Sequence, residues 1–458
     1  MPQKRPYHVA IVGSGPSGYF AASSLLKFAD SDDADRDVRV DMLEMLPTPW
    51  GLVRSGVAPD HPKIKSISAQ FDKTSGDPRF RFFGNIAVGE HVRPEELADR
   101  YDAVVYAVGA QSDRSLNIPG EDLPGSVAAV DFVGWYNAHP HFEQMGPDLS
   151  TGRAIVVGNG NVALDVARIL VTDPEALART DIADHALESL HRRGVEEVVV
   201  IGRRGPLQAT FTTLELRELG DLEGLGDVDV IVDPADFADI TDDDLESAGK
   251  TVKQNIKVLR GYAERSPRGA TRRIVFRFRT SPIEIKGREH VESIVLGRNE
   301  LVTDNGRVVA KDTGEREELS AQLVVRAVGY RGVPTPGLPF DERSGTIPHT
   351  DGRIDGRRNE YVVGWIKRGP SGVIGSNKKD SQATVDTVIA DLNGADLADF
   401  GDDHADRLVE WLVSRQPKLV TDDHWKVIDD YERSAGETAG RPRVKLTSVA
   451  ELLRIGHG

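Results

Sequence analysis

The stretch Tyr7–Gly18, with the sequence YHVAIVGSGPSG, decides the fold of the N-terminal part of this chain. Its apolar first half predicts a buried strand over residues 7–12, and its second half has the spacing Gly-x-Gly-x-x-Gly. Residues 20–28 follow with apolar side chains at helical spacing. Glycines alone would suit an ordinary tight turn, but a strand, a glycine turn and a helix in this order are typical of a βαβ unit that binds a dinucleotide.

The residue types in this turn fit the binding of a pyrophosphate. Gly13 permits the tight turn, Gly15 lets the backbone approach the phosphates, and Gly18 allows close packing of the helix. The first turn of the helix offers N–H groups and a partial positive charge. A second strand, predicted over residues 38–44, ends at Glu44, where a carboxylate can accept hydrogen bonds from both ribose hydroxyls. The candidates for this first site are Gly13, Ser14, Gly15, Pro16, Ser17 and Glu44.

A second unit of the same kind follows later in the chain, again after a short apolar strand. Residues 158–163, GNGNVA, have the spacing Gly-x-Gly-x-x-Ala and lead into a predicted helix and a further strand. Arg203 and Arg204 then stand where Glu44 stands in the first unit. Two guanidinium groups suit a 2′-phosphate by charge and shape, whereas a carboxylate repels it, so this site is predicted to select NADP. A solvated basic turn is the alternative.

Two dinucleotide sites in one chain imply one cofactor that is held and one that exchanges. We predict tightly bound FAD at the first site and exchanging NADPH at the second, with hydride transfer to the flavin. Residues 364–377, GWIKRGPSGVIGSN, precede a predicted helix, and their small side chains allow a close approach to a flat ring. A helix N-terminus here would stabilise the negative charge of a reduced flavin, whereas a glycine-rich surface loop is the alternative. Residues 361–365 are predicted to form a buried strand.

The composition excludes several classes of protein. The chain of 458 residues contains no cysteine, so it forms no disulfide, thiolate nucleophile, cysteine-ligated zinc site or iron–sulfur cluster, and no metal site is predicted. The formal net charge of −16 argues against general nucleic-acid binding. No apolar run is long enough to span a bilayer, and the N-terminal residues lack the pattern of a secretion signal, so a cytoplasmic enzyme is expected.

Several longer stretches resemble the adrenodoxin-reductase-like NADPH–ferredoxin reductases, and the similarity extends over essentially the whole chain. The most specific stretch is PTPWGLVRSGVAPDHP at residues 47–62. The stretches VGNGNVALDVAR at 157–168, IGRRGPLQATFTTLELREL at 201–219 and GWIKRGPSGVIGSNKKDS at 364–381 add to it, together with AIVGSGPSG of the first turn. The chain looks like a bacterial member of this family.

The resemblance implies an α/β fold with two Rossmann-like dinucleotide-binding domains, the NADP-binding domain being inserted into the FAD-binding domain. The implied FAD-binding domain covers residues 1–111 and 330–458, and the implied NADP-binding domain covers residues 112–329. The implied enzyme is a FAD-dependent NADPH:ferredoxin oxidoreductase, which oxidises NADPH and then delivers single electrons to a ferredoxin. Ferredoxins of this kind commonly supply haem monooxygenases.

The resemblance also assigns further contacts to both cofactors. Those implied for FAD are Leu52 and Val88, with Trp365, Gly372, Val373 and Ile374 against its isoalloxazine ring. Those implied for NADP are Arg114, just past the first crossing between the domains, and Asn159, Gly160, Asn161 and Val162 of the second glycine turn.

The resemblance implies roles near the nicotinamide for three more residues, and two of them have a structural alternative. Glu215 is implied to contact the nicotinamide carboxamide, but Thr212–Glu215 also matches a helix-capping box. His61 and Glu218 are implied to lie by the nicotinamide–flavin contact, where a histidine side chain can exchange a proton near neutral pH. A histidine held by its chain neighbours is the alternative for His61. Because hydride transfer depends chiefly on geometry, these residues are expected to tune rates without being indispensable.

The partner surface and two rival functions stay open at this point. Residues 250–290 hold twelve Lys and Arg side chains against three Glu, which suits either a solvated face or a docking surface for an acidic ferredoxin. One rival function is a related flavin reductase that serves quinones, dyes or a synthase subunit, and the other is a non-catalytic flavoprotein that senses NADPH. Thioredoxin- and glutathione-type reductases need a redox dithiol, so the absence of cysteine excludes them.

Overall fold

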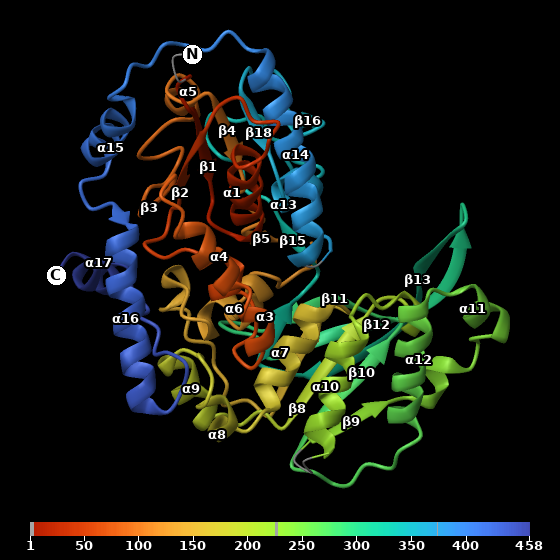
Figure 1. Ribbon diagram of the computed structural model, residues 1–458. Helices are drawn as coiled ribbons and strands as arrows, with labels where there is room; N and C mark the ends of the chain where they lie inside the picture. The colour runs from red at the N-terminus through yellow and green to blue at the C-terminus, as the bar shows by residue number, and fades with distance from the viewer. Residues whose placement is uncertain (1–3, 225–227, 373) are drawn as a thin grey trace. The chain divides into compact units, whose positions relative to one another are not determined.

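The computed structural model describes residues 4–224, 228–372 and 374–458. These residues form two compact units (Figure 1). The first unit comprises the chain up to Ser112 together with residues 137–140 and 330–458, and the second unit comprises residues 113–136 and 141–329. Apart from residues 137–140, the chain leaves and re-enters the first unit at two short strands, β5 (Ser112–Asp113) and β15 (Tyr330–Arg331).

The first unit is built on an eight-stranded sheet in the order β16-β17-β18-β4-β1-β2-β3-β19. Its central strands are parallel, and β1 pairs with β2 on one side and with β4 on the other. Val9 and Ile11 belong to one hydrophobic cluster and Ala10 and Val12 to another, so both faces of the sheet are buried. The strands are β1 (Tyr7–Val12), β2 (Val38–Leu43), β3 (Phe80–Gly84), β4 (Ala103–Tyr106), β16 (His349–Thr350), β17 (Arg353–Ile354), β18 (Glu360–Val362) and β19 (Val420–Thr421).

Helices cover this sheet. Helix α1, which follows the first glycine turn, packs against helix α14. Helix α1 begins with a proline. Proline has no backbone N–H, and at the first helical position an N–H would have no acceptor within the helix. The helices of the unit are α1 (Pro16–Ala29), α2 (Leu52–Ser55), α3 (Pro62–Lys65), α4 (Ser68–Ser75), α5 (Pro94–Ala98), α13 (Trp365–Arg368), α14 (Ile374–Gly394), α15 (His404–Arg415), α16 (Asp422–Ala439) and α17 (Val449–His457).

The second unit contains a six-stranded sheet in the order β6-β14-β7-β8-β10-β9, in which neighbouring strands are parallel. Its strands are β6 (Ser126–Ala128), β7 (Arg153–Val157), β8 (Glu197–Gly202), β9 (Val228–Val232), β10 (Arg272–Phe278) and β14 (Leu323–Arg326). Its helices are α6 (Ala129–Tyr136), α7 (Asn161–Val171), α8 (Pro174–Leu177), α9 (Asp184–His191), α10 (Thr213–Gly224), α11 (Asp242–Ser247) and α12 (Lys250–Ala263).

A second, antiparallel sheet belongs to the same unit and contains β11 (Thr280–Lys286), β12 (Ser293–Asp304) and β13 (Arg307–Ser320). Strands β12 and β13 form a long hairpin whose outer part extends away from the rest of its unit (Figure 1). The hairpin turns at Asn305 and Gly306, which have φ values of 48° and 75°. These are the residue types that tolerate the left-handed backbone of a two-residue hairpin turn.

The α/β prediction with two Rossmann-like units is confirmed, but the strand predicted over residues 361–365 is wrong in its second half. Strand β18 ends at Val362, and Trp365 begins helix α13. The reason is Gly364, whose φ of 76° turns the chain sharply between the two elements. Helix α14 begins at Ile374, within residues 364–377, which the sequence places before a helix.

Residues 137–140 pack with the first unit, although the resemblance places them in the inserted domain. The buried ammonium of Lys445 donates to the side-chain oxygen and to the backbone carbonyl of Asn137, each at 3.3 Å. Lys65 donates to the same side-chain oxygen at 3.2 Å. Two cationic side chains of the first unit therefore hold this short segment.

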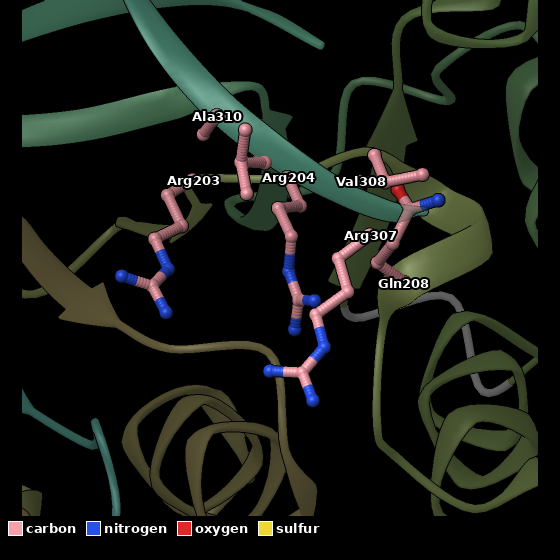
Figure 2. A pocket seen from close by; sticks show the side chains of 7 residues that line it. Arg203, Arg204, Gln208, Arg307, Val308 and Ala310 are labelled. Carbon is pink, nitrogen blue, oxygen red and sulfur yellow. The ribbon is translucent and has the colours of Figure 1, made fainter. Parts of the chain in front are cut away.

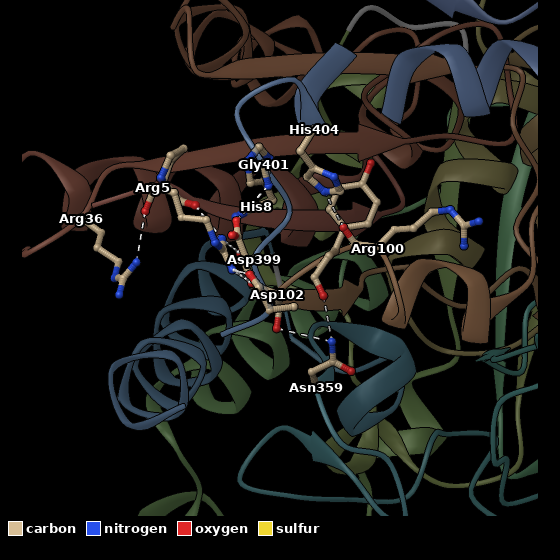
Figure 3. A network of polar contacts seen from close by, with 12 residues as sticks. Arg5, His8, Arg36, Arg100, Asp102, Asn359, Asp399, Gly401 and His404 are labelled. Carbon is tan, nitrogen blue, oxygen red and sulfur yellow. Dashed lines mark hydrogen bonds and ion pairs between the residues drawn. The ribbon is translucent and has the colours of Figure 1, made fainter. Parts of the chain in front are cut away.

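A polar network joins the start of β1 to helix α15 (Figure 3). The two carboxylate oxygens of Asp102 accept from Arg5 at 2.8 Å, and one of them also accepts the N–H of His8 at 2.9 Å. The ring of His8 meets the ring of His404 edge-on, with 4.9 Å between centroids. Burial, with a smaller effect of the nearby His404, lowers the pKa of His8 to about 4, so His8 is neutral at physiological pH.

Among the helices of the described residues, none combines the length and the apolar character needed to cross a membrane.

Candidate functional site

The first glycine turn is held by backbone packing on two sides and is open on the third. A Cβ atom on Gly13, whose φ is 104°, would lie 2.6 Å from the carbonyl oxygen of Ala107, and one on Gly18 would lie 2.1 Å from that of Gly13. A Cβ atom on Gly15 would meet nothing within 4 Å. Gly15 also precedes α1, whose first-turn N–H groups have no acceptor within the helix. The turn therefore presents bare backbone and helix donors to open space, which fits a pyrophosphate.

Glu44 follows the end of β2 and lies directly beside this turn. One carboxylate oxygen accepts the N–H of Ser14 at 2.9 Å and its hydroxyl at 2.6 Å, and the other accepts the N–H of Leu46 at 3.0 Å. These bonds fix the buried carboxylate in place, because each defines a different direction of approach. An ionised carboxylate has about four acceptor positions, so lone pairs remain for a ribose hydroxyl.

The segment Pro47–Pro62, which carries the most specific part of the resemblance, also supports the turn. The N–H of Trp50 donates to the carbonyl of Ser14 at 3.1 Å. A Cβ atom on Gly51, whose φ is 51°, would lie 2.9 Å from the Cα of Gly15. Leu52, a predicted FAD contact, is half-buried and begins α2 directly after this approach. The block therefore brings Leu52 to the turn.

Trp365 is brought to the same turn by the glycine before it. A Cβ atom on Gly364 would lie 2.3 Å from the hydroxyl of Ser17. The N–H of Gly364 donates to the carboxylate of Asp380 at 2.6 Å, and that carboxylate also pairs with Lys367 at 2.9 Å. Sequence reasoning missed Asp380, since no local pattern connects a carboxylate inside one helix to a glycine before another.

The indole of Trp365 fits a flat ring system. It stacks on Tyr330 with 5.5 Å between centroids and an interplanar angle of 28°. Its Nε1 is buried and has no hydrogen-bond partner among the described residues. A buried donor that the described residues leave unpaired can form a hydrogen bond to a ligand. The residues of the first unit therefore fit FAD.

The other predicted FAD contacts lie in two further segments. Val88 is half-buried and packs against the hydrophobic cluster that contains Val12, the last residue of β1 before the turn. Gly372 is exposed with a φ of 83°, and Ile374 begins α14 and packs against the core. Val373 lies outside the described residues.

The second glycine turn has the same construction and two asparagines that hold it. A Cβ atom on Gly158 would lie 2.2 Å from the carbonyl oxygen of Ala327. The carbonyl of Asn159 accepts the N–H of Thr210 at 2.8 Å, and the side-chain oxygen of Asn161 accepts the N–H of Thr212 at 2.7 Å. Asn159 and Asn161 thus tie the turn to the loop after β8.

The remaining residues of this second turn differ in how far they are buried. Gly160 precedes α7, Val162 is half-buried in its first turn, and Ala163 is fully buried in the third position of the motif. Arg114 lies near the turn. It is exposed, and its N–H donates at 3.1 Å to the carbonyl of Gly329, two residues past the Ala327 that packs on Gly158.

Arg203 and Arg204 follow β8 and line a pocket of about 500 Å³, together with Gln208 and residues 307–310 of β13 (Figure 2). Their backbone is fixed from outside the pocket. The carbonyl of Arg203 accepts from the side-chain amide of Asn299 at 2.9 Å, and that of Arg204 accepts the N–H of Arg279 at 3.0 Å. The guanidinium groups are left to face the pocket, as a 2′-phosphate site requires.

Glu215 and Glu218 of α10 lie around a buried cation, Arg168 of α7. The guanidinium of Arg168 lies 2.9 Å from the carboxylate of Asp165 and 3.5 Å from those of Glu215 and Glu218. Burial, followed by the negative charge of Asp165, raises the pKa of Glu215 to about 8, and Arg168 offsets only part of this. Glu215 is therefore mostly protonated at neutral pH and can donate a hydrogen bond.

The capping-box alternative for Glu215 is only half present. The N–H of Glu215 reaches the hydroxyl of Thr212 at the limiting distance of 3.5 Å. The return bond is not available, because the N–H of Thr212 already donates to Asn161. The Glu215 carboxylate faces Arg168 instead.

His61 is buried and precedes the short helix α3, where its carbonyl accepts the N–H groups of Ile64 and Lys65 at 3.1 and 3.2 Å. The histidine thus has a structural role through its backbone. These bonds involve the backbone of His61, and the role of its imidazole in proton exchange stays a prediction.

Four of the twelve cations in the basic stretch 250–290 pair with described carboxylates of the second unit, which favours the solvated-face interpretation for that part of the stretch. Arg273 pairs with Glu197, Arg277 with Glu317, Arg279 with Asp239 and Lys286 with Glu318. Arg260 and Arg265 lie over the rings of Phe237 and Tyr262. A docking surface needs charges that a partner can reach, and paired cations attract a partner less.

Comparisons with known proteins agree with this construction. Residues 7–216 match the family described as pyridine nucleotide-disulphide oxidoreductase. NADPH-ferredoxin reductase FprA of Mycobacterium tuberculosis (strain ATCC 25618 / H37Rv) is 74% identical over 459 residues, which cover 99% of this chain and 100% of that protein. The mitochondrial NADPH:adrenodoxin oxidoreductase of Salvelinus fontinalis is 39% identical over 460 residues, covering 98% and 90%.

A solved structure gives the same result at the level of the fold. The structure of Mycobacterium tuberculosis FprA in complex with NADPH superimposes with a TM-score of 0.97 at 74% identity, covering 99% of this chain and 100% of that one. The resemblance drawn from the sequence motifs is confirmed. The chain belongs to the family of NADPH–ferredoxin reductases related to adrenodoxin reductase.

Proposed function

We propose that the first unit of this chain binds FAD along the turn Gly13–Gly18 and that the second unit binds NADPH along the turn Gly158–Ala163. The chain is an NADPH–ferredoxin reductase, an oxidoreductase with FAD and NADP as cofactors. Bound FAD supplies the chemistry by which the hydride of NADPH becomes single electrons for a ferredoxin. The observation that carries the residue assignment is that Gly15 faces open space in a turn whose other glycines are packed.

In the first unit, the residues of the chain bind and orient. The turn and the first N–H groups of α1 would bind the pyrophosphate, and Glu44 would hold the ribose. Trp365, together with Leu52, Val88 and Gly372–Ile374, would enclose the isoalloxazine ring. The Trp365 indole donor, unsatisfied among the described residues, suits a carbonyl or ring nitrogen.

In the second unit, the charge and the protonation state of side chains would determine how NADPH is recognised. Arg203 and Arg204 would bind the 2′-phosphate by charge-assisted hydrogen bonds. Glu215, protonated at neutral pH, would donate to the carboxamide oxygen of the nicotinamide, with Arg168 holding the acid in position. Arg114 and Asn159–Val162 would contact the rest of NADP. His61 and Glu218 would tune the rate by exchanging the proton that accompanies the reaction.

The partner is a ferredoxin, and we propose that this ferredoxin in turn supplies haem monooxygenases. The support for this last step is the kinship with an adrenodoxin oxidoreductase. A cytoplasmic location also stays a prediction.

Anaerobic mixing tests this function against its rivals. NADPH should bleach the flavin absorbance of the purified protein within a single turnover, and oxidised ferredoxin should restore it. Restoration by quinones or dyes but not by ferredoxin would favour the general flavin reductase. A flavin band that NADPH leaves unchanged would favour the non-catalytic sensor.

A further inference from the structure

Arg307 is a cation without a carboxylate partner on a hairpin where other charged residues are paired. Within β12 and β13, Arg316 pairs with Asp312 at 2.6 Å and Lys311 with Glu300 at 3.0 Å. Arg307 is the first residue of β13 after the hairpin turn, and none of the described carboxylates pairs with it. An exposed arginine that is unpaired within the described chain is available to a ligand.

The side chain of Arg307 shares its pocket with two other unpaired arginines. Figure 2 shows Arg307 extending from β13 in the same direction as Arg203 and Arg204 extend from the turn after β8. The rest of the lining is Gln208 and the segment Val308–Ala310, so no acidic side chain lines the pocket. Neither Arg203 nor Arg204 has an ion-pair partner among the described carboxylates.

Three guanidinium groups around one pocket repel one another unless an anion joins them. A phosphate monoester carries a charge of about −1.5 to −2 near neutral pH and three acceptor oxygens, so it can engage three arginines at once. A carboxylate would satisfy fewer of these donors. The pocket therefore suits a phosphate monoester better than a smaller anion.

The hairpin also holds one of the other two arginines, Arg203, in place. Asn299 of β12 donates at 2.9 Å to the carbonyl of Arg203, so the strand that precedes the hairpin turn fixes the backbone of the site. Strand β13 returns along β12 and begins at Arg307. A single supersecondary element thus contributes both a support and a third cation.

We propose that Arg307 is a further specificity-determining residue, which binds the 2′-phosphate of NADPH as a third arm beside Arg203 and Arg204. The proposal rests on the assignment of Arg203 and Arg204 to this phosphate under the proposed function. Arg307 acts on the choice between NADPH and NADH and leaves hydride transfer itself unaffected, because it lies at the phosphate end of the nucleotide.

The test is Arg307→Ala in the FAD-loaded protein, with adenosine 2′,5′-bisphosphate and AMP as probes in calorimetric titrations. Loss of one charge-assisted contact at a partly exposed site should weaken binding of the bisphosphate by about five- to twentyfold and leave AMP binding unchanged. The KM for NADPH should rise by a similar factor, with kcat and the KM for NADH unchanged. Arg316→Ala, which removes a paired arginine from the same hairpin, is the matched control and should change none of these values.

The double variant Arg203→Ala with Arg204→Ala separates the two ideas. If it weakens bisphosphate binding and Arg307→Ala does not, the hairpin inference is overturned and the site assignment stands. If neither variant weakens binding of the bisphosphate more than binding of AMP, the assignment of this pocket to the 2′-phosphate is overturned as well. A selective loss in both variants supports the three-armed site.

Discussion

At the scale of single residues, the glycines of the first turn divide into those that the protein packs against and one that it leaves bare. Gly13 and Gly18 lie against backbone atoms of their own unit, so any side chain there collides with the fold. Gly15 has an ordinary φ of −73° and open space beside it. The sequence motif does not distinguish the three glycines, whereas the structure predicts that substitution of Gly13 or Gly18 disturbs the fold and substitution of Gly15 does not.

Gly15→Ala should therefore damage cofactor binding without damaging the fold. We expect the variant to keep the far-ultraviolet circular dichroism of the parent protein and to release its flavin on gel filtration, with a Kd for FAD at least about tenfold higher. Gly249→Ala is the matched control, because Gly249 also precedes a helix and also faces open space. Undiminished FAD affinity in Gly15→Ala would place the pyrophosphate elsewhere.

Glu215 leads to a pH dependence whose sign follows from its raised pKa. The folded protein holds this proton up to about pH 8, whereas the unfolded chain releases it near the ordinary value of 4.5. Over that window the folded state binds more protons, so this residue makes the free energy of unfolding fall as the pH rises. Glu215→Gln should reduce the loss of thermal stability between pH 6 and pH 8.

Asp221→Asn is the control for Glu215→Gln, because Asp221 is an exposed acid on the same helix. It should leave the pH profile as in the parent protein. A Glu215→Gln profile identical to that of the parent would show that Glu215 is already ionised at neutral pH, and its role as a hydrogen-bond donor would then be lost.

At the scale of elements, the contact between β1 and α15 gives a dependence of the opposite sign. The pKa of His8 is lowered to about 4, whereas the unfolded chain takes up this proton near 6.5. Between these values the unfolded state binds more protons, so stability is lost as the pH falls. At pH 5 the loss through His8 amounts to about 2 kcal/mol of the free energy of unfolding.

His8→Gln should flatten this acid limb. Denaturant unfolding at pH 7 and pH 5 should show a smaller difference in the variant than in the parent protein. His191→Gln, at an exposed histidine near the end of a helix, should leave the difference unchanged. An acid limb that is equally steep in His8→Gln would assign the effect to other groups.

Helices and strands could be predicted from the sequence where a local pattern of residues determines them. Strand β1 begins at Tyr7 and ends at Val12 as expected, because apolar residues followed by a glycine turn leave little choice. The contacts that complete the sites were not predictable, since they join residues far apart in the chain. Asn299 bonds to Arg203, which lies 96 residues away, and Gly364 lies against Ser17 across most of the sequence.

At the scale of the whole molecule, the chain repeats one architecture and varies its chemistry. Both units place a glycine turn after a parallel strand, and the residues after the next strand differ: Glu44 in the first unit, Arg203 and Arg204 in the second. A carboxylate there suits an unmodified ribose and two arginines suit a phosphorylated one. The two units are thus prepared for two different dinucleotides.

The most direct test is to count nucleotides on the intact protein. After gel filtration we predict one FAD per chain, and a titration with adenosine 2′,5′-bisphosphate should then show one further site whose occupation releases no flavin. Colourless protein, or a bisphosphate that displaces the flavin, would contradict the central claim that one chain holds two dinucleotides at separate sites.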